Sequence, residues 1–174
     1  MYILNKYYKN IIVQDLIYKF NIINLNNIPK IKKITVIFKS RNFKKFISYF
    51  LILELITLQK SCMLKNKKSA NNTFLTLKKG NIVGGFLIVR KSNMYLFFFK
   101  IIKIFIKNSF YLKLKKKNFL NSFSFNLKKL ILFTEIENNY KFFNQLKNLE
   151  ITITVFSNSL NEFLYLLYSF KIFK

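Results

Sequence analysis

The sequence contains no histidine and only one cysteine, Cys62, among its 174 residues. A lone cysteine cannot form an intrachain disulfide, and without histidine a Cys/His zinc site and imidazole acid–base catalysis are both excluded. Glu135 and Glu137 lie two apart on a predicted strand, but no metal-ligand cluster or nucleophile accompanies them, so we interpret them as surface charge. The sequence therefore predicts a protein that is not an enzyme and that holds no cofactor or metal.

Acidic residues are also scarce, with 6 Asp and Glu against 31 Lys and Arg, which gives a formal net charge of +25. No acidic residue occurs between Glu54 and Glu135, whereas lysines recur throughout that stretch. Such an excess of one sign repels itself unless a polyanion neutralises it. Lysines can neutralise phosphates and release counterions without reading a base sequence, so these features favour RNA binding guided by shape.

Anionic lipid is the alternative polyanionic partner. The sequence lacks an apolar run long enough to cross a membrane. Residues 46–58 are apolar but short and interrupted by Glu54, and residues 96–106 contain Lys100 and Lys103. We therefore expect no membrane insertion. The alternative function is that of a peripheral membrane protein, whose basic amphipathic helix over residues 94–107 lies on anionic lipid.

Alanine and proline each occur once, as Ala70 and Pro29, and tryptophan is absent, whereas Phe, Tyr, Ile, Asn and Lys are abundant. This skew toward residues with AT-rich codons indicates an organelle genome. The first ten residues resemble neither a signal peptide nor a transit peptide, which fits a protein made inside its organelle. We expect the mitochondrial matrix, with the plastid as the alternative.

The hydrophobic pattern predicts a single α+β domain over residues 1–174. Helical spacing marks residues 7–20, residues 43–58 and a segment that begins near Ser92, and alternation marks strands over residues 31–39 and 150–156. Residues 130–136 also read as a strand, while residues 59–72 are expected to form an exposed basic loop and residues 111–129 an irregular segment. Ser159 and Glu162 stand at capping-box spacing and begin the last helix. These elements indicate a largely antiparallel sheet with helices on one face and the other face left for RNA.

Two β-rich runs, residues 73–77 and 83–89, flank Lys78, Lys79 and Gly80 and predict a hairpin with a projecting basic turn. The three glycines lack the Gly-Lys-Ser/Thr ending of a phosphate-binding loop, and hairpin geometry explains them better.

Several short segments, in this order and at these spacings, together resemble one protein family. They are Tyr7-Tyr8-Lys9, Ile28-Pro29-Lys30-Ile31-Lys32-Lys33-Ile34-Thr35, Gln59-Lys60, Lys65-Asn66-Lys67-Lys68-Ser69, residues 130–136, residues 149–154 and the capped ending at residues 159–174. The set resembles the large-subunit ribosomal protein L-five family over nearly the whole chain. Where that family usually has proline, this chain has Ser61, Ile82 and Thr134, which predicts a less rigid loop and hairpin.

The resemblance implies a structural constituent of the large subunit of an organellar ribosome. Its implied partners are 5S rRNA, neighbouring large-subunit rRNA, P-site tRNA, other proteins of the central protuberance and a protein of the small-subunit head across an intersubunit bridge. It implies rRNA contacts at Lys30, Lys32, Lys33, Gln59, Lys60, Lys65, Lys67, Lys68 and Arg90. It implies a tRNA-proximal loop that includes Ala70, Asn71, Asn72, Thr73, Lys78, Lys79 and Gly80.

Overall fold

The computed structural model describes residues 3–39, 43–66, 70–72, 75–77, 79–108, 122–128, 130–137, 139, 143 and 148–172. The strands are β1 (Lys30–Lys39), β2 (Cys62–Lys65), β3 (Ala70–Asn72), β4 (Leu75–Leu77), β5 (Ile82–Val89), β6 (Ser122–Leu127) and β7 (Leu149–Phe156). The helices are α1 (Ile3–Tyr7), α2 (Val13–Phe20), α3 (Phe43–Thr57), α4 (Lys91–Asn108), α5 (Thr134–Glu137) and α7 (Leu160–Ser169). A π-helical turn, Tyr8–Ile12, joins α1 to α2, and the short 3-10 turns are Leu25–Asn27 and Leu130–Leu132.

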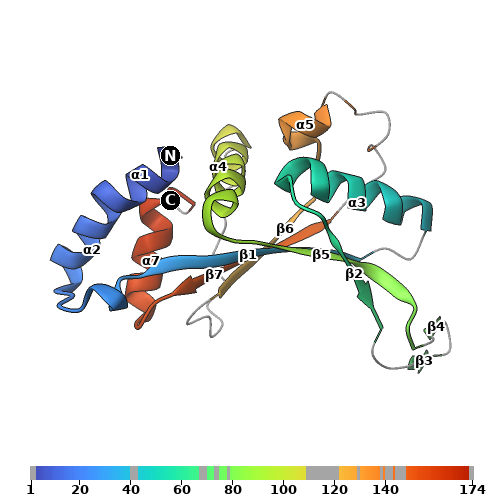
Figure 1. Ribbon diagram of the computed structural model, residues 1–174, viewed down its shortest axis with the longest axis horizontal. Helices are drawn as coiled ribbons and strands as arrows, with labels where there is room; N and C mark the ends of the chain where they lie inside the picture. The colour runs from blue at the N-terminus through green and yellow to red at the C-terminus, as the bar shows by residue number, and fades with distance from the viewer. Residues whose placement is uncertain are drawn as a thin grey trace. The chain divides into compact units, whose positions relative to one another are not determined.

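These elements form an α+β fold with a five-stranded antiparallel sheet in the order β2-β5-β1-β7-β6 and a two-stranded pair of β3 with β4 (Figure 1). The predicted fold class is confirmed. The chain divides into two compact units, unit 1 with Met1–Ile34, Val89–Phe125 and Thr152–Lys174, and unit 2 with Thr35–Ile88 and Asn126–Ile151. The expectation of a single domain stays a prediction.

Unit 1 is built on the apolar faces of its helices. α2 lies beside α7 (Figure 1), and the rings of Phe20 and Tyr165 meet edge to face with centroids 5.7 Å apart. The predicted helix from Ser92 is confirmed as α4, and it buries the apolar stripe Met94, Phe97, Phe98, Ile101, Ile102 and Phe105. Because this stripe fills the core, it is not available to a lipid surface, and the basis of the membrane alternative is removed. None of the helices in the described residues combines the length and apolarity needed to cross a bilayer.

The last helix begins as the sequence predicts. The Ser159 hydroxyl accepts a hydrogen bond from the Glu162 backbone N–H at 3.2 Å, and the Glu162 carboxylate accepts one from the Ser159 backbone N–H at 3.4 Å. Two backbone donors that the helix cannot satisfy internally are thereby paired. The capping box fixes where α7 starts and directs Phe163, Leu166 and Leu167 into the core of unit 1.

Unit 2 depends on a close approach between β5 and β1. Phe38 of β1 stacks on Tyr49 with ring centroids 4.8 Å apart and meets Phe50 edge to face at 5.5 Å. A Cβ atom at Gly84 would collide with the Phe38 carbonyl oxygen, and one at Gly85 would lie 2.6 Å from Phe38 Cε1 and 2.7 Å from Phe50 Cε2. The two glycines therefore let β5 lie against β1 and the aromatic cluster beneath it.

The predicted hairpin has the wrong partners. β5 pairs antiparallel with β2, with Met63 opposite Gly85, and β4 pairs with β3 instead of with β5. The prediction that residues 59–72 form a loop is also wrong, because strands β2 and β3 lie within this range. Lysines and asparagines in this stretch obscured its strand character in the sequence, whereas pairing with the apolar β5 determined β2 and pairing with β4 determined β3.

Two further predictions of secondary structure are wrong. Residues 130–136 form a 3-10 turn followed by α5 instead of a strand, so Glu135 and Glu137 stand on a helix and do not share one face. Within the segment predicted as irregular, Ser122–Leu127 is strand β6, with Phe123, Phe125 and Leu127 buried in alternation. The other predicted helices and strands, over residues 7–20, 31–39, 43–58 and 150–156, are confirmed with small changes at their ends.

We predict that Gly84→Ala lowers the free energy of unfolding by about 3 kcal/mol, the upper end of what overpacking costs, because backbone atoms of β1 must move. Chemical denaturation of the full chain measures this. The control is Gly80→Ala, which adds the same Cβ to a residue at φ +90° with open space around it and costs about 1 kcal/mol for its backbone conformation. An equal loss in the two variants would contradict the close approach.

Candidate RNA-binding surface

Three of the predicted RNA-binding lysines gather at the start of β1 in unit 1. Lys30 and Lys32 are exposed and Lys33 is half-buried, whereas Ile31 and Ile34 point into the core. Lys32 and Lys33 follow each other between these two buried isoleucines. The start of β1 therefore presents the side chains of Lys30 and Lys32 at the surface, with the half-buried Lys33 next to them in the strand.

An aromatic ring orders two of these lysines. The Nζ atom of Lys32 lies 4.7 Å from the centroid of the Phe156 ring, and that of Lys30 lies 6.0 Å from it. The negative face of the ring attracts both ammonium groups, while the lysine stems cover apolar surface and the charged heads remain in water. Phe156, the last residue of β7, thus lies near the ammonium groups of two lysines of β1.

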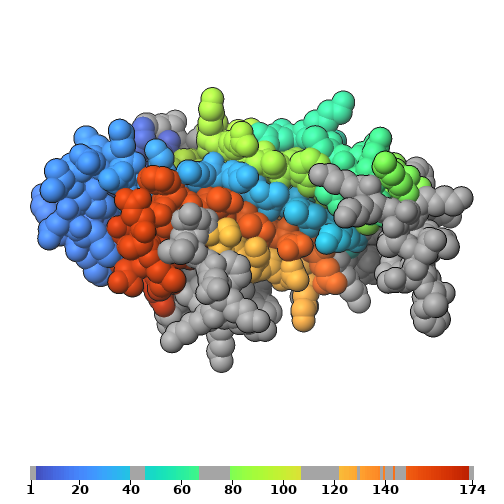
Figure 2. All heavy atoms as spheres, turned by 90° about the horizontal axis from the view of Figure 1, so that it is seen from below, coloured from blue at the N-terminus to red at the C-terminus, as the bar shows by residue number. Residues whose placement is uncertain are grey.

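Hydroxyl groups lie on the neighbouring strands β7 and β6. The parts of β1, β7 and β6 that belong to unit 1 run side by side at the surface (Figure 2). The Ser124 and Thr152 hydroxyls share a hydrogen bond of 2.9 Å, and Thr154 is half-buried next to them along β7. Hydroxyls can both donate and accept, so this face can bind phosphate oxygens and ribose 2′-hydroxyls.

Negative charge is rare around these cations. Within the residue ranges of unit 1, the sequence has two acidic residues, Asp15 and Glu162. Both stand on helices, and Glu162 is engaged in the capping box of α7. A polyanion that approaches the start of β1 therefore meets ammonium and hydroxyl groups on the strands of this unit.

Tyr8 fixes the backbone that leads into β1. Its hydroxyl donates a hydrogen bond to the Pro29 carbonyl oxygen at 2.8 Å, and its ring stacks on Phe170 with centroids 6.2 Å apart. Burial, together with the nearby Tyr95 hydroxyl, raises the pKa of Tyr8 above its usual range, so the hydroxyl keeps its proton. Tyr8 is buried and does not stack on bases; it holds the residue that precedes Lys30 in place.

The predicted RNA-binding residues of unit 2 begin at the end of α3. The backbone N–H and the hydroxyl of Ser61 both donate to Glu54 Oε1, each at 3.1 Å. These bonds hold the turn at Ser61, the position where the resembled family usually has proline. Lys60 is exposed and Gln59 is half-buried. The one acid of α3 therefore serves the turn and does not neutralise Lys60.

The next predicted residues lie on and beyond β2. Lys65 is exposed at the end of β2, opposite Ile82, where the register of the pair shifts. The backbone carbonyl of Asn66 accepts a hydrogen bond from the Gly80 N–H at 3.0 Å, and the backbone N–H of Asn66 donates one to the Asn81 carbonyl at 2.9 Å. Lys79 and Gly80 thus lie in an exposed turn that is hydrogen-bonded to Asn66, the residue after β2.

The structure assigns the predicted site residues to the two units. Unit 1 holds Lys30, Lys32, Lys33 and the exposed Arg90, and unit 2 holds Gln59, Lys60, Lys65, Ala70, Asn71, Asn72, Lys79 and Gly80. Ala70, Asn71 and Asn72 form β3, which pairs with β4. Lys67, Lys68, Thr73 and Lys78 lie outside the described residues.

Sequence reasoning missed the non-cationic part of the surface of unit 1, namely Phe156, Thr152, Thr154 and Ser124. Phe156 was hidden among 22 phenylalanines, most of which suit a core. The strict alternation of Ser122–Leu127, with serine and asparagine against phenylalanine and leucine, was a usable signal for the strand that carries Ser124.

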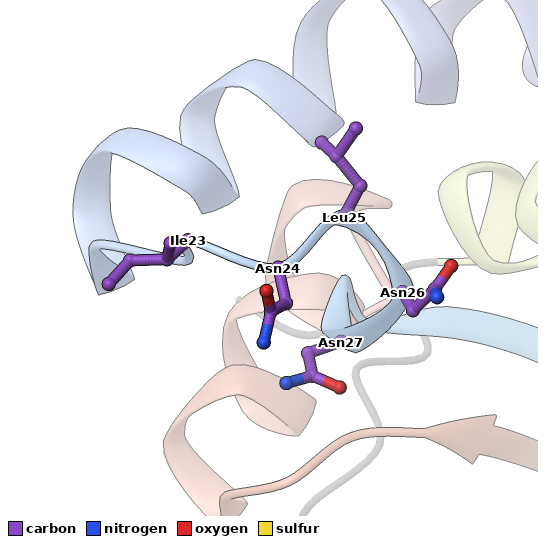
Figure 3. Close-up of a pocket in the computed structure, with 5 residues that line it drawn as sticks. All are labelled: Ile23, Asn24, Leu25, Asn26 and Asn27. Atoms are coloured by element: carbon purple, nitrogen blue, oxygen red, sulfur yellow. The ribbon is translucent and has the colours of Figure 1, made fainter.

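The described residues offer no catalytic arrangement. They contain no group of three His, Cys, Asp or Glu side chains placed to hold a metal ion, and Cys62 is free and exposed. A hollow of unit 1 is lined by Ile23, Asn24, Leu25, Asn26 and Asn27, and it carries amide and aliphatic groups without an ionisable side chain (Figure 3). This loop has neither an acid nor a base with which to perform chemistry.

Comparison with known proteins gives clear relatives, although no protein-family model matches the chain. The chain is 34% identical over 176 aligned residues to the large ribosomal subunit protein uL5m of Reclinomonas americana, and the alignment covers 97% of this chain and 96% of that protein. It is 31% identical over 105 residues to uL5 of Borreliella afzelii and 33% identical over 105 residues to uL5 of Blochmanniella floridana. Those alignments cover 58% of this chain and 57% and 54% of the two bacterial proteins.

The fold, the grouped cations and the full-length likeness define a structural protein of the ribosome. The chain belongs to the uL5 family of large ribosomal subunit proteins. This family is structural and not enzymatic, which confirms the expectation that the chain is not an enzyme. The resemblance noted from its short segments is confirmed as well.

We predict that Tyr8→Phe lowers the free energy of unfolding by about 1 to 2 kcal/mol, because the buried Pro29 carbonyl loses its donor. Denaturant unfolding of the full chain measures the loss. Tyr18→Phe is the matched control, since Tyr18 is 82% exposed, and a change below about 0.5 kcal/mol is expected for it. A Tyr8→Phe variant as stable as the control would show that the hydrogen bond does not hold the entry to β1.

Proposed function

We propose that this chain is a structural component of the large subunit of a mitochondrial ribosome, where it binds 5S rRNA and the adjacent large-subunit rRNA. The observation that carries the proposal is the pair of Lys30 and Lys32 over Phe156, next to Lys33 in β1, in a member of the uL5 family. Lysines on a strand beside serine and threonine hydroxyls suit an RNA backbone better than a lipid surface, because they can pair with phosphate oxygens and with ribose 2′-hydroxyl groups.

In unit 2, we assign further rRNA contacts to Gln59, Lys60 and Lys65, together with Lys67 and Lys68 in the sequence that follows. Lys60 and Lys65 are exposed, and the Glu54–Ser61 bonds hold the turn that presents Lys60. Arg90 is assigned to rRNA in unit 1, where it is exposed between β5 and α4. Each of these side chains reaches a phosphate as a point charge or a planar donor.

The segment from Ala70 to Gly80 is proposed to approach the P-site tRNA. The exposed turn at Lys79 and Gly80 supports this role, because it presents a cation just after the short pair of β3 and β4. Neighbouring proteins of the central protuberance and a protein of the small-subunit head are the proposed protein partners.

The mitochondrial setting rests on two observations. The relative that aligns over 96% of its length is named uL5m, the mitochondrial form, and the amino-acid usage of this chain follows AT-rich codons. We propose that the gene lies in the organelle and that the protein works in the matrix. Mass spectrometry of purified mitochondrial large subunits tests this, and subunits that lack the chain would overturn the proposed function.

We predict that replacing Lys30, Lys32 and Lys33 together by Ala weakens binding of the full chain to 5S rRNA at least about tenfold at physiological salt. The slope of log affinity against log salt concentration falls by about 2, because up to three phosphate contacts are lost. Filter binding or fluorescence anisotropy over a salt series measures both quantities.

The control replaces Lys6, Lys9 and Lys103 by Ala, which removes the same charge from exposed helix positions of unit 1. Its slope is expected to change by less than half as much as that of the β1 variant. If both triple variants lose the same affinity and slope, net charge alone binds the RNA and the β1 cluster is not the site.

We predict a similar effect for Lys65→Ala, Lys67→Ala and Lys68→Ala combined, with weaker 5S rRNA binding and a flatter salt dependence. Hydroxyl-radical footprinting of 5S rRNA with this variant and with the β1 variant distinguishes the nucleotides that each group protects. Unchanged affinity at every salt concentration would remove these three lysines from the site.

A further inference from the structure

The outer side of α3 carries an aliphatic stripe that the rRNA contacts do not explain. Ile47, Leu51 and Leu55 are 48%, 51% and 41% exposed, and Leu58, just past the helix, is 76% exposed. A spacing of four residues places Ile47, Leu51 and Leu55 on one side of α3 over about two turns, and Leu58 follows the helix in a left-handed backbone conformation with φ 56°. The inner side is apolar too, with Phe46, Tyr49, Ile52, Leu53 and Ile56 buried. An α-helix that covers a core is normally polar on its outer side, so α3 has a second apolar face to cover.

The chemistry of this stripe excludes RNA as the molecule that covers it. Isoleucine and leucine side chains have no charge for a phosphate, no donor or acceptor for a base edge and no ring on which a base can stack. The one acid of α3, Glu54, accepts both Ser61 hydrogen bonds and belongs to the turn after the helix. The stripe therefore requires an apolar surface of similar length.

Charge decides between the remaining occupants. A second copy of this chain would bring another +25 against the first, and that repulsion opposes self-association. The exposed Lys60 follows Leu58, and in the sequence Lys44 and Lys45 precede Ile47. A partner with an aliphatic centre and acidic ends complements this pattern in both hydrophobicity and charge.

From these features we infer that α3 is a docking surface for another protein, which lays an amphipathic helix along Ile47, Leu51, Leu55 and Leu58. The partner helix carries Leu, Ile or Val at intervals of three or four residues and Asp or Glu near its ends. This interaction is additional to the proposed rRNA contacts and rests on the proposed function only in that the partner is expected among ribosomal proteins.

A photo-crosslinking experiment in intact organelles tests the inference. The full chain carries Leu51→p-benzoylphenylalanine, and after irradiation the linked peptide is sequenced by mass spectrometry. The expected adduct is a peptide from another protein with the aliphatic spacing and acidic ends described above. Adding Ile47→Gln and Leu55→Gln should lower its yield at least about tenfold, the effect of losing one well-buried aliphatic contact.

The control adds Ile82→Gln and Ile88→Gln, which remove two exposed isoleucines of β5 and should leave the yield unchanged. Because Ile47 and Leu55 are exposed, their replacement should move the thermal midpoint by less than about 2 °C. An adduct with rRNA, with lipid, with a second copy of this chain or with a peptide that lacks the stripe overturns the inference, as does the absence of any adduct. Sedimentation of the same chain with large subunits is read separately, so that failure of the proposed function is distinguished from failure of the docking surface.

Discussion

Mutual repulsion among the cations is the constraint on which the rest of this structure depends. With 31 Lys and Arg against 6 acids, the fold must keep every ammonium group near water while it gathers enough apolar surface to stay compact. The buried residues of the described part are accordingly aliphatic and aromatic, with Thr57, Ser61 and Ser157 the polar ones and no lysine among them. Aromatic clusters around Phe38 and around Phe98 and Phe170 provide large buried area from few residues.

The same constraint explains how acids are used. Glu162 completes the capping box of α7, and Glu54 accepts hydrogen bonds from Ser61. Both carboxylates therefore accept hydrogen bonds from backbone N–H groups. Neither carboxylate serves to neutralise the lysines that are proposed to face RNA. The protein thus leaves its charge for an external polyanion, and its folded shape determines where that charge is presented.

Much of the fold could be predicted from the sequence, and the exceptions have physical causes. Strong periodicity predicted β1, α4, β7 and the capped start of α7, because one face of each is buried within its own unit. β2 was missed because its strand character comes from pairing with β5, and residues 130–136 were misassigned because a continuous apolar run suits a buried helix as well as a strand. The lysines of the candidate surface were predicted by position, whereas Phe156 and the Ser124–Thr152 pair depend on neighbours far apart in the chain.

The position of Lys30 and Lys32 over the Phe156 ring has an entropic consequence. A free lysine loses considerable rotational freedom when it is fixed on a phosphate, and that loss opposes binding. Here the ring already restricts both stems before any anion arrives. In the proposed rRNA contact, the number of charges sets how steeply binding responds to salt, and the ring lowers the entropic cost of ordering the two lysines.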